Sequence, residues 1–239
     1  MIKALQKQKK SGFCSAVIVA AGSSLRFGAD KLGAELLGKS VLERSLLAFS
    51  ACDMVDEIIL VTREDALEET TEKCKGLKIS KLHTVVSGGE TRTHSAFAGV
   101  SAADRRAKTI LIHDAARPLV KVELIKRMIE ALDKNVAACP AVSVKDTIKI
   151  SENDKSAKTL SRDALHAVQT PQAFDADIIK AALTKDIRSG ETHTDDCAAA
   201  EAMGAPVFIA DGDEENIKIT TAIDLSVAKA ILEARGECL

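Results

Sequence analysis

Residues 15–21 read SAVIVAA, and the chain runs on from them into GSSLRFGADK at residues 22–31. An unbroken run of small and β-branched residues predicts a strand that is buried on both faces. Small residues after such a strand let backbone N–H groups approach a ligand, and Arg26 and Lys31 add two cations that suit a phosphate chain. The glycine spacing is not that of a dinucleotide fingerprint, and a tight turn with solvated charges would look the same.

Similar short apolar runs follow along the next hundred residues and alternate with amphipathic stretches. The pattern predicts strands at residues 56–62, 82–87 and 109–113, and helices at residues 41–50, 63–75, 90–103 and 121–133. Strands that alternate with helices predict an α/β fold, here a Rossmann-like, doubly wound and mostly parallel sheet.

This alternation breaks near residue 136. From there to residue 174, short extended runs with polar turns predict an antiparallel excursion, and we expect residues 140–172 to form a protruding β-arm. Helical patterns return at residues 176–188, 194–203 and 222–235, with a strand at residues 206–210. No repeat or long linker divides the chain, so we predict a single domain over residues 1–239 with a frayed tail at residues 1–12.

The composition excludes several classes of function. The 239 residues carry 33 Lys and Arg against 35 Asp and Glu, so the chain has no general attraction to nucleic acid or anionic membranes. It has six Phe but neither Trp nor Tyr, which weighs against recognition by stacked rings. No apolar run is long enough to span a bilayer. Six widely spaced cysteines without zinc-site spacing indicate a cytoplasmic protein with free thiols.

Glycines and polar residues also follow two later strands. The string SGGETRTHS at residues 87–95 places two glycines at a strand end and opens a helix, so its backbone can contact a ligand. HDAARP at residues 113–118 puts Asp114 at the carboxyl edge of the sheet, where open α/β folds bind ligands. Asp114 could anchor a hydroxyl, lie near Mg²⁺ or pair with Arg117. Lys218, in a predicted strand at residues 216–220, could reach the site or face water.

Two further strings match motifs for which we favour plainer interpretations. Residues 33–40 (GAELLGKS) match the P-loop pattern, but the preceding strand ends about a dozen residues too early to aim a phosphate cradle. We therefore expect a turn at Gly38. Residues 192–196 (THTDD) precede an apolar helix, which favours an N-cap over a metal cluster.

Ordered motifs run through nearly the whole chain. They are VAAG with Arg26 and Lys31, LLGKSVLERSL, GGETR with Ser95, HDAARPLV, VKDTIK, AVQTPQAF, TDD and NIKIT. Together, over about residues 15–232, they resemble the 2-C-methyl-D-erythritol 4-phosphate cytidylyltransferases of the non-mevalonate route to isoprenoids. The resemblance implies a fold of the nucleotide-diphospho-sugar transferase type. It also implies transfer of CMP from CTP to methylerythritol 4-phosphate, with release of pyrophosphate and a requirement for Mg²⁺ or another divalent cation.

Roles for individual residues follow from the same resemblance. CTP would contact Ala20, Ala21, Gly22, Gly89, Glu90, Ser95, Asp114 and Ala115. The catalytic cations would be Arg26, Lys31, Arg162 and Lys218. The sugar-alcohol phosphate would contact Asp114, Arg117, Thr147, Arg162, Thr170, Thr194 and Thr220. Mg²⁺ would be held mainly by the phosphates of CTP, near Asp114, and the arm would reach into the neighbouring subunit of a homodimer.

The sequence departs from the family at the loop after the first strand. Ser24 stands where a glycine is common, Phe27 replaces the usual Met, and Lys31 lies in Asp-Lys-Leu rather than Pro-Lys-Gln, after a shortened loop. Three alternatives therefore remain open. They are a pentitol (ribitol) 5-phosphate cytidylyltransferase, a P-loop NTPase built on residues 33–40, and a non-catalytic nucleotide-binding domain.

Overall fold

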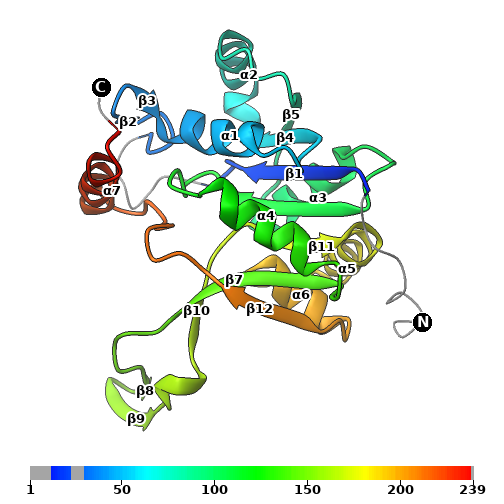
Figure 1. The fold of residues 1–239 in the computed structure, drawn as a ribbon. Coiled ribbons are helices and arrows are strands. Elements are labelled where there is room, and N and C mark those ends of the chain that lie inside the picture. Colours follow the sequence, from blue (N-terminus) through cyan, green and yellow to red (C-terminus); the bar gives the residue numbers. More distant parts are fainter. Residues whose placement is uncertain (1–11, 23–29, 238–239) are drawn as a thin grey trace.

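The computed structural model describes residues 12–22 and 30–237, and its centre is a mixed eight-stranded sheet (Figure 1). From one edge the neighbouring strands are β5, β4, β1, β6, β11 and β7, and both β10 and β12 pair with β7. The eight strands are β1 (Cys14–Val19), β4 (Glu57–Thr62), β5 (Leu82–Ser87), β6 (Thr109–Asp114), β7 (Ala137–Ser143), β10 (His166–Val168), β11 (Gln172–Asp175) and β12 (Val207–Asp211). The tail predicted at residues 1–12 lies almost wholly outside the described residues.

Strand β1 lies inside the sheet and pairs in parallel with β4 on one side and with β6 on the other. Val17 lies opposite Ile59 of β4 and Ile112 of β6, and all three side chains are fully buried. The prediction of a strand buried on both faces is thus confirmed. After β1 the chain builds β4 and β5 on one side and then returns to β6 on the other, so the carboxyl ends of β1 and β6 flank a topological switch point.

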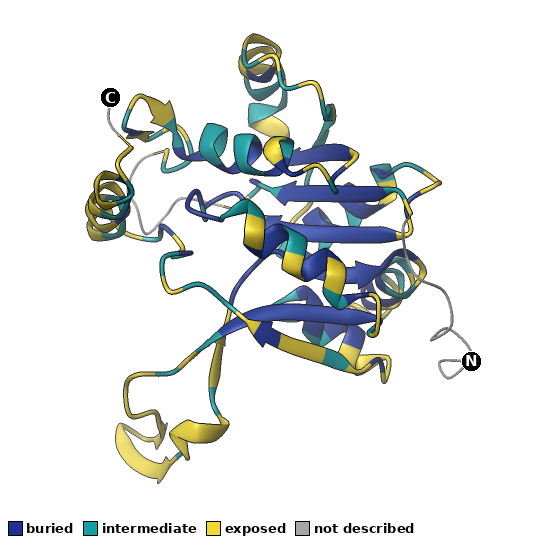
Figure 2. Ribbon diagram, in the orientation of Figure 1, coloured by how far each residue is buried: buried dark blue, intermediate teal, exposed yellow. Residues whose placement is uncertain are grey.

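Beyond β6 the sheet becomes mixed. Strand β11 runs antiparallel to both β6 and β7, β10 runs antiparallel to β7, and β12 runs parallel to β7. This confirms the antiparallel excursion predicted after residue 136. Between β7 and β10 the chain leaves the sheet through the hairpin of β8 (Lys149–Glu152) and β9 (Lys155–Thr159) and the short helix η3 (Arg162–Ala164), all of them exposed (Figures 1 and 2).

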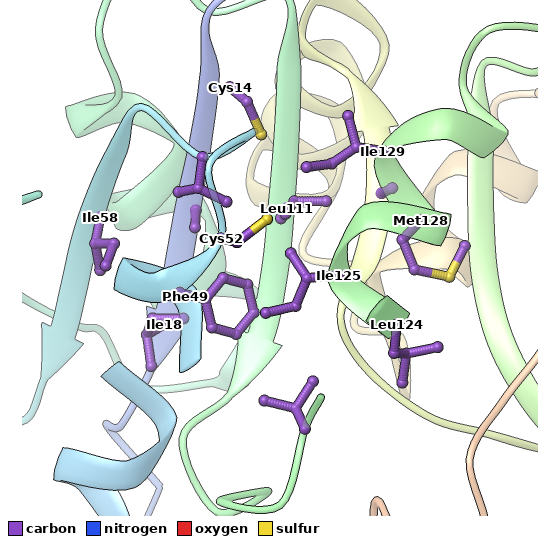
Figure 3. Packing of buried hydrophobic residues seen from close by; sticks show 14 of the residues in the cluster. Cys14, Ile18, Phe49, Cys52, Ile58, Leu111, Leu124, Ile125, Met128 and Ile129 are labelled. Carbon is purple, nitrogen blue, oxygen red and sulfur yellow. The ribbon is translucent and has the colours of Figure 1, made fainter. Parts of the chain in front are cut away.

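Helices cover both faces of the sheet, which makes it doubly wound as predicted. On one face, α1 (Val41–Ala51) and α4 (Val122–Ala131) pack Phe49, Ile125 and Met128 against Ile18 and Leu111 (Figure 3). Each such side chain contributes about 1.5–3 kcal/mol by leaving water. The helix α2 (Leu67–Gly76), preceded by η2 (Glu64–Ala66), adds to the same cluster. On the other face lie α3 (Arg92–Ala102), α5 (Ala176–Ser189) and α6 (Asp196–Ala202).

The string that matches a P-loop is a β-hairpin. Strands β2 (Glu35–Leu36) and β3 (Lys39–Ser40) pair antiparallel around Leu37 and Gly38, whose φ angles are 50° and 74°. The expected turn at Gly38 is confirmed, and Ser40 caps α1 by accepting a hydrogen bond from the Glu43 amide. The buried side chain of this hairpin, Leu36, packs with α7 (Ala222–Ala234), so the string is a packing element rather than a phosphate cradle.

One predicted strand is wrong. Residues 216–220 form no ladder with any described strand; the segment is irregular chain with one backbone bond to the loop after β6, from the Ile219 amide to the Ala116 carbonyl, 2.8 Å long. The strand-like pattern came from the alternation of polar and apolar residues in NIKIT, but exposure does not follow it, because Asn216 is buried while Lys218 is exposed. Within residues 12–22 and 30–237, every helix is too short or too polar to span a bilayer.

Candidate functional site

A pocket of about 360 Å³ opens at the carboxyl ends of β1 and β6, and we refer to it as the switch-point pocket. Open α/β sheets bind ligands at this place because the loops after neighbouring strands diverge there. The pocket is lined by Val19, Ala20, Ala21, Gly22, Lys31, Leu32, Arg63, Gly89, Glu90, Thr91, Arg92, Ser95, Asp114, Ala116 and Lys218.

The carboxylate of Asp114, at the end of β6, lies between two cations of the pocket. Its Oδ2 accepts a 2.7 Å hydrogen bond from Lys218 Nζ, and its Oδ1 lies 3.4 Å from Arg92 Nη2. Arg92 also donates a 2.7 Å hydrogen bond to Asp196, which is almost fully buried at the start of α6. The pair considered from the sequence, Asp114 with Arg117, is replaced by these contacts, because Arg117 donates instead to the carbonyl of Asn216.

These contacts fix the charge of the site. Burial alone would raise the pKa of Asp114, but Arg92 and Lys218 more than offset burial and hold that pKa well below its usual range. Asp114 is therefore ionised at every working pH. Burial raises the pKa of Asp196, and Arg92 opposes that rise only in part. Lys218 and Arg92 are thus held at the pocket by carboxylates of the protein itself. Cations gathered in one pocket can bind a polyanion.

The turn after β5 brings the backbone into the pocket. A Cβ on Gly88 would lie 2.6 Å from Ser95 Oγ and 2.7 Å from Ala21 Cβ, so only glycine lets the two loops approach this closely. The Gly89 amide donates to Ser95 Oγ, and Thr91 caps α3 by accepting from the His94 amide. The amino end of α3 therefore lies at the pocket, where its amides and dipole favour an anion or an electronegative base edge.

A buried polar relay sets the position of Asp114. His113 is fully buried, and its Nε2 donates to the carbonyl of Arg117 while its Nδ1 accepts from Thr170 Oγ1. The same hydroxyl oxygen accepts from the Asp114 amide at 3.1 Å. Burial lowers the pKa of His113 to about 4, so the ring is neutral at pH 7 and holds this hydrogen-bonding pattern.

Many of the residues predicted from the sequence line this one pocket, and their individual roles stay predictions. They are Ala20, Ala21, Gly22, Lys31, Gly89, Glu90, Ser95, Asp114 and Lys218. Arg26 lies outside the described residues.

Other predicted residues do not line the pocket in this structure. Ala115 is fully buried, and its carbonyl accepts from Ser45. Arg117 anchors the segment that carries Lys218 through its bond to Asn216, and Thr220 anchors the same segment by donating to Asp224. Thr170 belongs to the relay above. Thr194 lies in the loop before α6 and is not among the described residues that line the pocket.

Thr147 and Arg162 are exposed residues of the segment that leaves the sheet between β7 and β10 (Figures 1 and 2), and neither lines the pocket. Arg162 Nη1 donates to the carbonyl of Lys145, a contact within the arm.

Sequence reasoning missed Arg63 and Arg92 as pocket residues. Arg63 follows β4 directly, so the rule that ligands bind at the carboxyl ends of strands would have indicated it. Arg92 stands at the first position of α3, within the GGETR string, but its partner Asp196 is 104 residues away and only the packed fold reveals that pair.

Comparison with known proteins identifies close relatives. The family model described as 2-C-methyl-D-erythritol 4-phosphate cytidylyltransferase matches residues 14–234. Curated proteins of that name include one from Caldanaerobacter subterraneus, 41% identical over 226 residues that span 91% of this chain and 98% of the relative. Another, from Dictyoglomus thermophilum, is 38% identical over 90% of this chain and 95% of the relative.

Solved structures of proteins with such names are also similar to this chain. The crystal structure of 4-diphosphocytidyl-2C-methyl-D-erythritol synthase from Anaerococcus prevotii superposes with a TM-score of 0.84 at 36% identity and covers 94% of this chain and 98% of that one. The 2-C-methyl-D-erythritol 4-phosphate cytidylyltransferase of Thermus thermophilus gives a TM-score of 0.77 at 30% identity, over 91% of this chain and 98% of the other.

Proposed function

Since the chain belongs to the 2-C-methyl-D-erythritol 4-phosphate cytidylyltransferase family, its reaction is the transfer of CMP from CTP to methylerythritol 4-phosphate, and we propose that the switch-point pocket performs it. The products are the CDP-sugar alcohol and pyrophosphate. The observation that supports this assignment is the pairing of Lys218 and Arg92 with Asp114 beside a glycine turn that brings backbone amides to the same pocket.

CTP is held largely by backbone in this proposal. The loop of Ala20, Ala21 and Gly22 and the turn at Gly89 both line the pocket, and Ser95 ties the turn to α3. Amides and carbonyls arranged in this way can read the edge of a cytosine without an aromatic platform, which suits a chain with neither Trp nor Tyr.

In this proposal the triphosphate lies against two cations of the pocket, Lys31 and Lys218, and Arg26, which precedes Lys31 in the chain, adds a third. The phosphate of methylerythritol phosphate attacks the α-phosphorus of CTP, the bond to the β-phosphate oxygen breaks, and pyrophosphate leaves. The attacking phosphate monoester is already largely ionised at neutral pH, so no general base is needed. Each well-placed cation can contribute about 3–4 kcal/mol to the transition state, by analogy with oxyanion-hole donors.

We propose Mg²⁺ or a similar divalent cation as the cofactor. The residues present fit such an ion, because Asp114 is an ionised carboxylate on the pocket wall and Mg²⁺ is usually bound by one or two carboxylates together with substrate phosphates. The phosphates of CTP would supply most of the ligands and Asp114 would lie nearby. When bound, the ion neutralises phosphate charge and orients the α-phosphorus.

The arm is proposed to form a homodimer and to complete the partner's site. The segment that leaves the sheet between β7 and β10 is mostly exposed, with Ile148 and Ile150 at 38% and 44%, and Val168 of the sheet strand β10 is 40% exposed. Exposed apolar side chains on this projection and beside it favour contact with another subunit. Thr147 and Arg162 would then bind methylerythritol phosphate in the neighbouring pocket, together with Arg117, Thr170, Thr194 and Thr220 as positioning residues.

We place the enzyme in the cytoplasm, since all cysteines that the structure describes are free thiols.

A direct assay tests the assignment. Purified protein is incubated with CTP, Mg²⁺ and either methylerythritol 4-phosphate or ribitol 5-phosphate, and pyrophosphate release is followed. We expect turnover with methylerythritol 4-phosphate. Turnover with ribitol 5-phosphate alone would move the chain to the pentitol group, and CTP binding without product would leave only a nucleotide-binding domain.

A further inference from the structure

Three potential metal ligands meet where α5 ends, on elements that do not line the switch-point pocket. Asp186 lies in the last turn of α5, and Gly190 ends that helix with a φ angle of 72°. This left-handed residue reverses the chain, so that Glu191 and His193 return toward Asp186. The ligand atoms of the three side chains all lie within 4.8 Å of one another.

Asp186 is the unusual member of this cluster. Its side chain is 99% buried, and neither carboxylate oxygen has a hydrogen-bond partner. Among the ion pairs of the described residues, its one contact is His193 Nε2, 3.4 Å from Oδ1, and that nitrogen is itself buried without a hydrogen bond. A buried carboxylate left without partners costs several kcal/mol, so this arrangement favours a bound cation.

We propose that Asp186, Glu191 and His193 bind a divalent transition-metal ion of the Zn²⁺ class. Two ligand atoms about 2.0–2.2 Å from a tetrahedral ion lie about 3.3–3.5 Å apart, and Asp186 Oδ1 and His193 Nε2 are separated by 3.4 Å. Two carboxylates and a neutral imidazole balance a charge of +2. The imidazole selects Zn²⁺ and its neighbours over Mg²⁺ and Ca²⁺, which prefer oxygen ligands only.

A simple ion pair between His193 and Asp186 explains fewer features of this cluster than a bound metal ion does. It leaves Oδ2 of Asp186 without a partner, and it gives no reason for Glu191 to lie close by. The N-cap predicted at residues 192–196 is confirmed and is compatible with the metal site, because the capping residue is Asp195, which accepts from the Ala198 amide.

Such an ion would fix the loop between α5 and α6. That loop leads directly to Asp196, the buried partner of Arg92 in the switch-point pocket. The metal site is thus a structural site that anchors one wall of the pocket, and it is separate from the divalent cation proposed for CTP.

The test uses the full chain after removal of metal with a chelator. Calorimetric titration with Zn²⁺ should give one site per chain, and saturation should raise the thermal midpoint by about 5 °C. We expect Asp186→Asn and His193→Gln to weaken Zn²⁺ binding at least tenfold, while His83→Gln, at an exposed histidine of β5, leaves binding unchanged. Tetrahedral Co²⁺ bound at the site should show visible bands without a thiolate charge-transfer band.

A second readout separates lost binding from misfolding. Metal-free Asp186→Asn should unfold at the same or a higher temperature than the metal-free wild type, because the substitution removes an unpartnered buried charge. The proposal is overturned if the wild type binds no Zn²⁺, if both variants bind as tightly as the wild type, if a thiolate band shows that cysteines hold the ion, or if Mg²⁺ produces the same thermal shift.

Discussion

Lys218 Nζ lies 2.7 Å from Asp114 Oδ2, although 104 residues separate the two along the chain. Asp114 is placed by β6 and by the buried relay through His113 and Thr170. Lys218 lies on irregular chain that Arg117 and Thr220 anchor. The sheet edge and the C-terminal segment therefore meet at one ion pair, so the cation of that pair is held beside the pocket before any substrate arrives.

Replacing Lys218 with alanine should lower kcat about 10²–10³-fold, because one preorganised charge facing the reacting phosphates is lost. The matched control is Lys126→Ala. Lys126 is 38% exposed and pairs with Asp53 at 2.8 Å, whereas Lys218 is 39% exposed, but Lys126 lies on α4 and does not line the pocket. Steady-state pyrophosphate release measures both variants, with circular dichroism to confirm folding. Near-normal kcat in Lys218→Ala would remove Lys218 from the catalytic group.

Acid should destabilise the protein partly through His113. Burial lowers its pKa to about 4 from 6.5, so between these pH values the unfolded chain binds a proton that the folded chain does not. The free energy of unfolding therefore falls as the pH is lowered from 6.5 to 4, by about 3 kcal/mol from this group. Urea unfolding at several pH values measures the slope.

His113→Gln should flatten that slope, although its stability at pH 7 also drops through loss of the bond to Thr170. His83→Gln provides the control, since His83 is exposed and its loss should leave the slope unchanged. A slope in His113→Gln equal to that of the wild type would assign the acid sensitivity to other groups.

The sequence predicted those parts of the site that follow from strand ends. Residues 15–21 offer no polar face, so the strand within them, β1, had to be buried, and Asp114 had to lie at the sheet edge because it ends another such strand. Both inferences depend only on local sequence pattern and on the general geometry of parallel sheets, so they can be made from one sequence.

What the sequence did not predict depends on contacts between distant elements. The pairing of Arg92 with Asp196 arises because α3 and α6 pack on the same face of the sheet, and nothing near either residue in the chain indicates it. Residues 216–220 alternate between polar and apolar side chains like a strand, yet the neighbouring chain at Ala116 is a loop, so one backbone bond forms instead of a ladder.

Gly88→Ala should weaken CTP binding. The new Cβ would lie 2.7 Å from Ala21 Cβ and 2.6 Å from Ser95 Oγ, and while the hydroxyl can rotate away, the Ala21 methyl group can move only with its backbone. We expect the KM for CTP to rise about tenfold, with a loss of about 1–3 kcal/mol in the free energy of unfolding. Gly76→Ala is the control, because a Cβ there meets no atom within 4 Å. An unchanged KM for CTP would show that the turn does not shape the base site.

Mixing two inactive variants tests the role of the arm. If Arg162 serves the partner's pocket and Lys31 its own, a heterodimer of Arg162→Ala and Lys31→Ala chains contains one site with both residues intact. Random reassociation makes half of the dimers heterodimers with one working site of two, so about one quarter of wild-type activity should return. Activity is measured after the chains are mixed, with a tag on one variant to show that heterodimers form. Heterodimers without activity would place Arg162 in its own subunit's site or outside any site, because complementation needs the arm to cross between subunits.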